Sequence, residues 1–330
     1  MKRLLKGGGF VFAVVAVIVL AALFPARGTF GDVLTGLTAV VIAVLFVLYG
    51  TRLSPSEAWE GLRHWRLHIL VLISTFVAFP LLGLAGKLLM PSILTPDLYT
   101  GVLYLCLVPS TLQSSVTFVS MARGNVPAAM VTASLSNMLG VVVTPLLVFL
   151  LIHPGRAPNV DGSALLNIAV LLLLPFAIGQ ILRPRIGDWV ERNARVTSIF
   201  DRVTILLVVY SAFSFGMAQH VFRAVSPWRI VEMVAVCAVL LAAMLGVTYG
   251  ISRLAGLSRA DTTVVVFCGS KKSLGSGLPM ALLLFGVDKV GLIMLPLMLY
   301  HQIQLVVCAW IAGRMSHDEQ SDGAPAAAEP

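Results

Sequence analysis

The stretch Phe267–Gly277, FCGSKKSLGSG, places two adjacent lysines among glycines and serines in an otherwise apolar chain. Hydrophobic residues make up 58% of the 330 residues, charged residues make up only 12%, and the mean hydropathy is +0.95. Soluble domains carry about 25% charged residues, and here apolar runs long enough to cross a bilayer recur along the chain. The composition predicts an all-α polytopic membrane protein. The lysines would then lie in a surface loop, a phosphate loop or a site at membrane depth.

Apolar segments predict ten transmembrane helices, at residues 10–24, 33–53, 67–90, 98–122, 127–152, 164–182, 197–217, 230–251, 261–285 and 290–312. The first follows a basic start and resembles a secretory signal, although the topology favours keeping it as a helix. The segment 316–330 has no apolar periodicity and is predicted to be a disordered cytoplasmic tail.

The distribution of charge predicts the orientation and the surroundings. With the N-terminus inside, most Lys and Arg residues lie in the cytoplasm, so both termini are expected there. The net charge of +8 favours the lipid bilayer over nucleic acid as a partner, because the basic residues flank apolar runs. A short basic N-terminus and compact loops favour a bacterial inner membrane. The four cysteines lie in apolar segments and are interpreted as small core residues.

Two of the ten spans are interrupted. The quoted stretch separates 262–267 from 278–285, and neither half reaches the roughly 20 residues that a crossing needs. The span 98–122 contains the polar run VPSTLQSS, with Pro109 near its start. Irregular backbone at membrane depth is tolerated only where it is buried in protein or lines a wet cavity. The fourth and ninth helices are therefore predicted to be broken.

The two breaks lie 162 residues apart, close to half the chain. At that offset Cys106, Thr111, Leu112 and Ser114 pair with Cys268, Ser273, Leu274 and Ser276. Interrupted helices at matching positions in two halves indicate the binding site of a transporter. Because each half holds five helices, an odd number, the second half would be inverted. We expect 5+5 inverted repeats over residues 1–152 and 153–315.

The segments VPSTLQSSVTFVSMARGNVPAAM, GVVVTPLL and FCGSKKSLGSGLPMA together resemble the bile acid:sodium symporter family, and most closely its SBF-like branch, over about residues 9–314. The resemblance implies ten helices in a core and a panel domain, with helices 4 and 9 crossing near mid-membrane. It also implies coupling of two sodium ions to the import of an organic anion. The substrate and ion site is then expected at Pro109, Ser110, Thr111, Gln113, Ser114, Ser115, Gly269, Ser270, Lys271, Lys272 and Ser273.

The resemblance also implies a sodium site after the first crossover, where the family's Ser-Asn pair corresponds to Ser114 and Ser115. Two hydroxyls that the family adds from its fifth helix fall on Ala129 and Ala133, which have no side-chain oxygen. Thr132 lies on a neighbouring face of that helix. Ser114, Ser115 and Thr132 are therefore the candidate sodium ligands.

The second crossover departs further from the family pattern. Sodium-coupled members carry an acidic residue followed by Gly-Met-Gln-Asn. Alignment on Gly269 puts Cys268 at the acid, Ser270 at the methionine, and Lys271 and Lys272 at the Gln-Asn pair. At an effective dielectric of about 20, an ammonium in contact with a sodium ion repels it by several kcal/mol. The lysines therefore argue against sodium coupling.

Two interpretations of the lysines stay open. In one, a lysine takes the place of the cation and the other faces the substrate cavity, beside a positive half-helix N-terminus near Leu274. A buried lysine that loses its proton would also permit proton coupling. In the other, both lysines extend to the cytoplasmic surface and anchor the helix. A phosphate loop is disfavoured because GSKKS lacks the first glycine of that motif.

Polar residues of other spans are candidates for the cavity wall: Thr132, Ser136, Asn137, His301 and Gln304. A histidine in a bundle is more often an interhelical hydrogen-bond partner than a ligand. Structural roles are predicted for Asn167, Gln180, Asp201 and Glu232.

The sequence thus predicts a secondary active transporter of a small organic anion, working by alternating access. It predicts no enzyme activity and no cofactor, with Na⁺ or H⁺ as the candidate coupling ion. An intramembrane enzyme would need paired acids, a metal motif or a Ser-His pair at membrane depth. Because the family's acidic residue is missing, a non-transporting regulatory protein on the same fold stays an alternative. The identity of the substrate and the oligomeric state are open.

Overall fold

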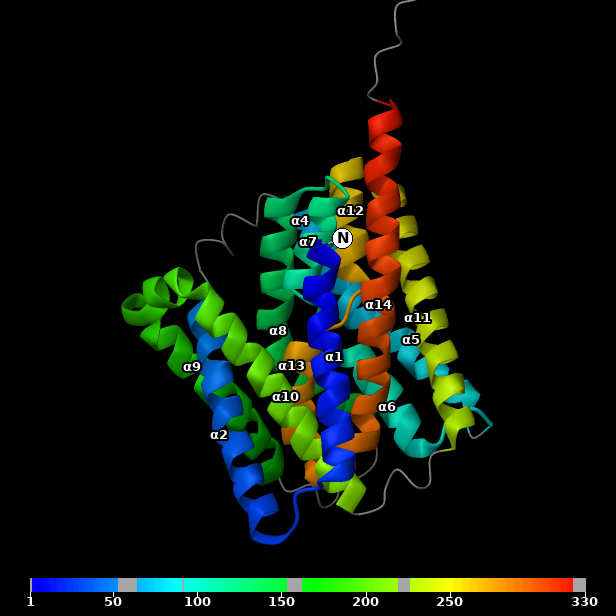
Figure 1. The fold of residues 1–330 in the computed structure, drawn as a ribbon. Helices are drawn as coiled ribbons and strands as arrows, with labels where there is room; N and C mark the ends of the chain where they lie inside the picture. Colours follow the sequence, from blue (N-terminus) through cyan, green and yellow to red (C-terminus); the bar gives the residue numbers. More distant parts are fainter. Residues whose placement is uncertain (1, 53–63, 91, 153–161, 219–225, 323–330) are drawn as a thin grey trace, which may run out of the picture.

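A computed structural model describes residues 2–52, 64–90, 92–152, 162–218 and 226–322, and within these ranges the chain is helical with no strand (Figure 1). The α-helices are α1 (Lys2–Leu23), α2 (Gly28–Arg52), α4 (Trp65–Ile73), α5 (Phe79–Ala85), α6 (Pro96–Leu107), α7 (Gln113–Met121), α8 (Val126–Ile152), α9 (Gly162–Arg192), α10 (Ala194–Ala218), α11 (Pro227–Leu254), α12 (Arg259–Gly269), α13 (Leu274–Phe285) and α14 (Val287–Asp322).

Long apolar helices confirm the prediction of an all-α membrane protein. Six stretches of the described chain are long and apolar enough to cross a bilayer: Gly28–Arg52, Trp65–Leu89, Val126–Ile152, Ala194–Phe215, Trp228–Leu254 and Val290–Ser316. Each of the predicted apolar segments falls on one helix or on a run of consecutive helical elements, which for residues 67–90 includes a 3-10 turn at Gly86–Leu89.

Both predicted breaks are present. The first apolar-polar-apolar segment forms α6 and α7, and α6 ends where Val108 turns extended, with φ −73° and ψ 155°. Pro109 explains this ending, because a residue before proline is driven out of the helical region. The quoted stretch forms the end of α12 and the start of α13, where the side chain of Ser273 caps the N–H of Ser276.

A third irregularity, which the sequence analysis did not predict, lies between α4 and α5. Ser74–Ala78 form one π-helical turn, in which the N–H of Phe79 bonds to the carbonyl of Ser74. The next bond in this register would run from Pro80 to Thr75, but proline has no N–H. The carbonyl of Thr75 is therefore left for another donor.

The helices divide into two groups. In the four-helix group, α2 packs on α9 and on α10, and α10 packs on α1. Gly50 and Gly179 allow the closest of these contacts, since a Cβ on Gly179 would lie 2.1 Å from the carbonyl oxygen of Val47. The remaining helices, α4–α8 and α11–α14, form the crossover group. In Figure 1, α2 and α9 lie to the left of this group.

The last helix is longer than the sequence suggested. α14 continues to Asp322, into the segment 316–330 for which we predicted disorder. A residue added to an existing helix needs no new nucleus, so polar residues can extend it cheaply. Residues 323–330 lie outside the described ranges. The predicted repeat boundary after residue 152 falls at the end of a described range, and residues 153–161 that follow it lie outside.

Candidate functional site

The two helix breaks lie against each other. The N–H of Ser273 donates to the carbonyl of Pro109 (2.8 Å), and the hydroxyl of Ser110 donates to the carbonyl of Cys268 (2.6 Å). The structure therefore brings the two predicted crossover segments into one site, as the family resemblance implies.

The side chain of Lys272 is held at this site by several contacts of its ammonium. It is fully buried. Its ammonium donates to three backbone carbonyl oxygens, those of Thr75 (2.9 Å), Cys106 (2.8 Å) and Val108 (2.8 Å). The nitrogen also lies 4.0 Å from the centroid of the Phe79 ring, a cation–π distance. All three protons of the ammonium thus have an acceptor.

Helix interruptions supply these carbonyls. The last carbonyls of α6 have no helical donor, and Pro109 offers no N–H. The carbonyl of Thr75 is available because Pro80 interrupts the π-helical register. The C-terminal end of a helix also carries partial negative charge. Lys272 therefore occupies a pocket of the kind that binds cations in transporters with broken helices.

The peptide of Lys272 is held from α14. Gln304 is fully buried; its side-chain oxygen accepts from the N–H of Lys272 and its nitrogen donates to the Lys272 carbonyl, both at 2.9 Å. One turn earlier, the hydroxyl of Tyr300 donates to the carbonyl of Ser270 (2.7 Å). His301 contacts Gln304 (2.9 Å) and lines the adjacent cavity. The predicted pair His301 and Gln304 does reach the crossover.

Lys271 has the opposite surroundings. It is also fully buried, but its ammonium has no hydrogen-bond partner among the described residues. The nitrogen lies 4.1 Å from the centroid of the Phe118 ring. Phe118 belongs to an apolar cluster that also contains Cys268 and Cys308. Adjacent lysines are thus held in a polar and an apolar pocket.

The burial of the lysines bears on both sequence interpretations, while the placement of one lysine at the position of the cation stays a prediction. Neither lysine extends to the surface, because both side chains have no exposed area. Neither lines the cavity described below. The helix break turns both side chains into the crossover group, and periodicity alone could not predict that direction.

Among the described residues, the candidate sodium ligands are not all joined by hydrogen bonds. Thr111 joins Ser114 (2.8 Å) and Ser115 (3.1 Å) through their hydroxyls. The hydroxyl of Thr132 instead contacts a ring nitrogen of His68 (2.6 Å) on α4 and donates to a carbonyl of its own helix. The hydrogen-bond partners of Thr132 are therefore other residues than the two serines.

Other predicted residues form contacts at the two breaks. The hydroxyl of Ser136 accepts from the N–H of Ser110 (3.1 Å), and the amide of Asn137 donates to the Ser110 carbonyl (2.8 Å). Gly269 lies in a tight contact, where a Cβ would meet a methyl of Thr248 at 2.9 Å. Ser270 donates back to the carbonyl of Val266 (2.6 Å).

A cavity of about 320 Å³ lies beside the breaks, between the two helix groups. The crossover group lines it with Thr111, Gln113, Ser114, Asn137, Ser273, Gly275, Ser276 and His301. Both α7 and α13 begin at this cavity, so the positive ends of two half-helices are directed at it. Ser276 is 3% exposed, and its hydroxyl has no hydrogen-bond partner among the described residues.

The four-helix group supplies the formal charges of the cavity wall, and the sequence analysis missed this side. Arg52, Asp201 and Arg202 line it, with Tyr49 beside them. The guanidinium of Arg52 binds the carboxylate of Asp201 through two nitrogens, at 2.7 and 3.2 Å. An acidic residue inside an apolar span was the available signal, but we interpreted Asp201 as structural.

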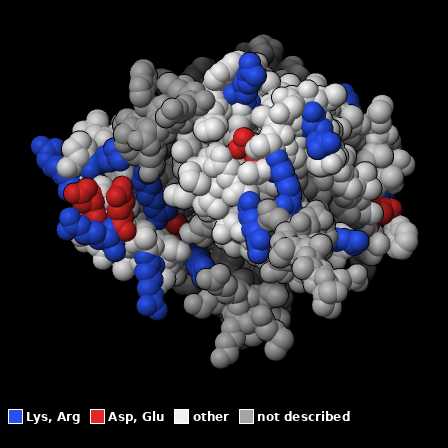
Figure 2. All heavy atoms as spheres, turned by 90° about the horizontal axis from the view of Figure 1, so that it is seen from above, with Lys and Arg blue, Asp and Glu red and all other residues white. Residues whose placement is uncertain are grey.

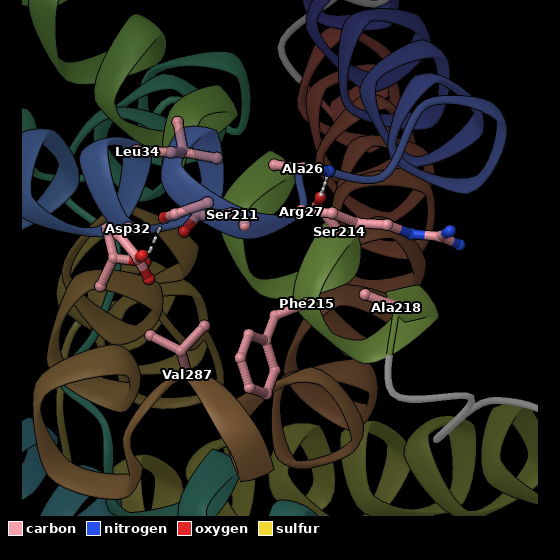
Figure 3. A pocket seen from close by; sticks show the side chains of 12 residues that line it. Ala26, Arg27, Asp32, Leu34, Ser211, Ser214, Phe215, Ala218 and Val287 are labelled. Carbon is pink, nitrogen blue, oxygen red and sulfur yellow. Dashed lines mark hydrogen bonds between the residues drawn. The ribbon is translucent and has the colours of Figure 1, made fainter.

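A second cavity, of about 410 Å³, lies where α2 begins and α10 ends (Figure 3). Asp32, Ser211, Phe215 and Val287 line it, and the side chain of Arg27 extends away from it in the close-up. The hydroxyl of Ser214 accepts from the N–H of Ala26 at its edge. None of the residues singled out in the sequence lines this cavity.

Known proteins match nearly the whole length of the chain. Residues 8–317 match the family model described as the SBF-like CPA transporter family. The chain is similar to an uncharacterised protein of Pseudomonas aeruginosa, with 47% identity over 97% of this chain and 96% of the relative. It is similar to "Putative symporter YfeH" of Escherichia coli, with 44% identity over 92% of each. Sodium/bile acid cotransporter 7-B of Xenopus laevis is 29% identical over 90% of this chain and 88% of its own length. The chain belongs to the SBF-like CPA transporter family.

Proposed function

We propose that the protein is a secondary active transporter of a small organic anion, that it works by alternating access, and that an internal lysine replaces a coupling sodium ion. Membership of a transporter family supports transport, and the cavity between two helix groups supports alternating access. The four-helix group would act as the panel and the crossover group as the core. No enzyme activity is part of the proposal.

Ten helices in 5+5 inverted repeats, divided at residues 152 and 153, are part of the proposal. A pair of hydrogen bonds supports the repeat. Ser110 donates to the carbonyl of Cys268, and Lys272 donates to the carbonyl of Cys106. At the offset of 162 residues, Ser110 corresponds to Lys272 and Cys106 to Cys268. Each bond is therefore the counterpart of the other.

The observation that carries the sodium-independent mechanism is the pocket of Lys272. Three carbonyls at helix interruptions are the ligand type that a transporter offers to sodium, and here an ammonium binds all three. A tethered cation needs no ion from solution. Lys271, whose ammonium has no acceptor in the described part of the chain, is the candidate for carrying a coupling proton.

The anionic group of the substrate is proposed to bind where α13 begins. A helix N-terminus offers unpaired N–H groups and a positive dipole end. The hydroxyl of Ser276, which is buried and has no hydrogen-bond partner within the described ranges, adds a donor at this point. A Cβ built on Gly275 would lie 3.7 Å from the hydroxyl oxygen of Tyr49, so the panel faces this helix start directly.

We propose a bacterial inner membrane as the location, with both termini in the cytoplasm. Figure 2 looks onto the end of the molecule at which α11 ends and α12 begins, and Lys and Arg are spread over this face with fewer Asp and Glu. An excess of Lys and Arg is typical of the cytoplasmic side.

The test is the thermal stability of the purified protein at fixed ionic strength, with sodium replacing potassium. We expect no saturable rise in Tm, because a ligand raises Tm only when it binds the native state. The double variant Lys271→Gln, Lys272→Asn restores the polar pair of the sodium-coupled relatives and serves as the comparison. A saturable rise of several degrees in the wild type would contradict the built-in cation.

A further inference from the structure

We infer that the anionic group of the cargo is a carboxylate, that Arg52 binds it on the panel, and that Asp201 is an internal carboxylate which the cargo displaces. This inference rests on the proposed function and names the substrate class of the same cavity. Asp201 holds Arg52 in an end-on, two-point geometry that a carboxylate substrate could also adopt, with Nη1 and Nη2 at 2.7 and 3.2 Å from the two carboxylate oxygens.

The pair lies where a substrate would reach it. Both residues line the cavity, and their side chains are 28% and 17% exposed, so neither is sealed in the protein. Arg52 is the last residue of α2, where the negative end of the helix favours a cation. Its guanidinium carbon lies 5.8 Å from the ring centroid of Tyr49. The hydroxyl of Tyr49 in turn faces Gly275 at the start of α13. A carboxylate on Arg52 would therefore lie close to the positive end of the core half-helix.

The chemistry favours exchange of one carboxylate for another. A guanidinium presents two parallel N–H groups that match a planar carboxylate, and such charge-assisted pairs are about twice as strong as neutral hydrogen bonds. Because Asp201 offers Arg52 the same two carboxylate oxygens, replacing Asp201 by the cargo carboxylate gains little binding free energy on Arg52 alone. The gain in binding free energy comes from the helix dipole and the N–H donors at the start of α13, which are available to the cargo but not to Asp201 on the panel. The cargo carboxylate thus links panel to core.

The experiment measures Tm of the purified full-length protein in potassium buffer against acetate, butyrate, hexanoate and benzoate. Each acid is compared with its neutral amide and with phosphate. We expect one or more of the acids to stabilise the wild type saturably, while the amides do not. Asp201→Asn should lower the Kd of the best acid about tenfold or more, because Arg52 loses its internal competitor.

Two variants of Arg52 complete the design. Arg52→Gln should raise the same Kd about tenfold, and adding Asp201→Asn to it should bring no recovery. Arg52→Lys keeps the charge but not the fork, and should weaken the acids while leaving the protein folded. Glu232→Gln is the matched control. It releases Arg229 from an ion pair of 3.0 Å outside the cavity and should leave every Kd unchanged.

Unchanged or weaker binding of the acids in folded Asp201→Asn would overturn the inference while leaving transport of an organic anion intact. Tightening for phosphate but not for the acids would overturn the assignment of a carboxylate. If none of the acids stabilises the wild type, the control or Asp201→Asn, the inference and the proposed anion site both fail.

Discussion

At the scale of single residues, the adjacent side chains of Lys271 and Lys272 are expected to have opposite effects on the stability of the fold. The ammonium of Lys272 has three carbonyl acceptors, whereas that of Lys271 contacts the face of Phe118 and has no hydrogen-bond acceptor among the residues that the structure describes. A desolvated cation–π contact contributes about 2 kcal/mol. Burial of an ammonium without acceptors costs several kcal/mol. Lys271 is therefore expected to lower the stability of the fold, which is typical of residues kept for function.

Methionine in place of each lysine should change stability in opposite directions. Lys272→Met leaves buried carbonyls without a donor, and we expect a loss of about 3 kcal/mol. Lys271→Met removes an unsatisfied ammonium and keeps the volume, so we expect equal or higher stability. Tm of the two purified variants at neutral pH checks this. Equal losses in both would contradict the difference between the two pockets.

At the scale of the elements, a hydrogen bond matters most where a helix is interrupted. Tyr300 and Tyr104 are both fully buried and both donate to a backbone carbonyl, at 2.7 Å to Ser270 and at 2.6 Å to Gly277. Gly277 lies inside α13, where its carbonyl also has a helical donor. Ser270 follows the end of α12 and has no such donor by position.

The same substitution at the two tyrosines should therefore have different costs. Tyr300→Phe leaves an unpaired buried carbonyl and should cost about 1–3 kcal/mol, whereas Tyr104→Phe should cost less than about 1 kcal/mol. Denaturation midpoints of the two variants provide the comparison. Because each ring also packs edge-on against a phenylalanine, Phe79 or Phe285, the packing change is matched. A larger loss of stability in Tyr104→Phe than in Tyr300→Phe would contradict the expectation that a hydrogen bond matters most where a helix is interrupted.

At the scale of the whole molecule, two glycines lie at different kinds of helix contact. Gly179 lies in a close packing contact between two helices, and Gly275 faces the cavity. A Cβ on Gly179 would lie 2.1 Å from a carbonyl oxygen of α2, within the four-helix group. A Cβ on Gly275 would have its nearest neighbour at 3.6 Å, on Ile205 across the boundary between the groups.

Alanine at these two glycines should separate folding from function. Gly179→Ala forces two packed helices apart and should lower stability by about 2 kcal/mol or more. Gly275→Ala fits, and should raise stability by up to about 1 kcal/mol through helix propensity. It should nevertheless weaken the saturable response to carboxylates, because the methyl group occupies the space between α13 and the panel. Tm with and without the best acid measures both effects; an unchanged Kd in Gly275→Ala would exclude this helix start as the anion site.

The sequence by itself determined the membrane class, the helical segments and the two breaks. These features follow from local chemistry: the length of apolar runs, the backbone restriction imposed by Pro109, and polar residues where a bilayer tolerates none. The meeting of the two breaks was expected from the family resemblance, which implies that helices 4 and 9 cross near mid-membrane. Ser136, Asn137 and Gln304 were predicted as candidates for the cavity wall because they are polar residues within apolar spans.

Only the tertiary structure decided what the two lysines contact and which residues complete the cavity. The acceptors of Lys272 come from two distant helices, and one of them, Thr75, is available only because a π-helical turn meets Pro80. The pairing of Arg52 with Asp201 joins positions 149 residues apart. Such contacts depend on how helices pack in space, and the hydrophobic periodicity that predicts a helix carries no information about its partners.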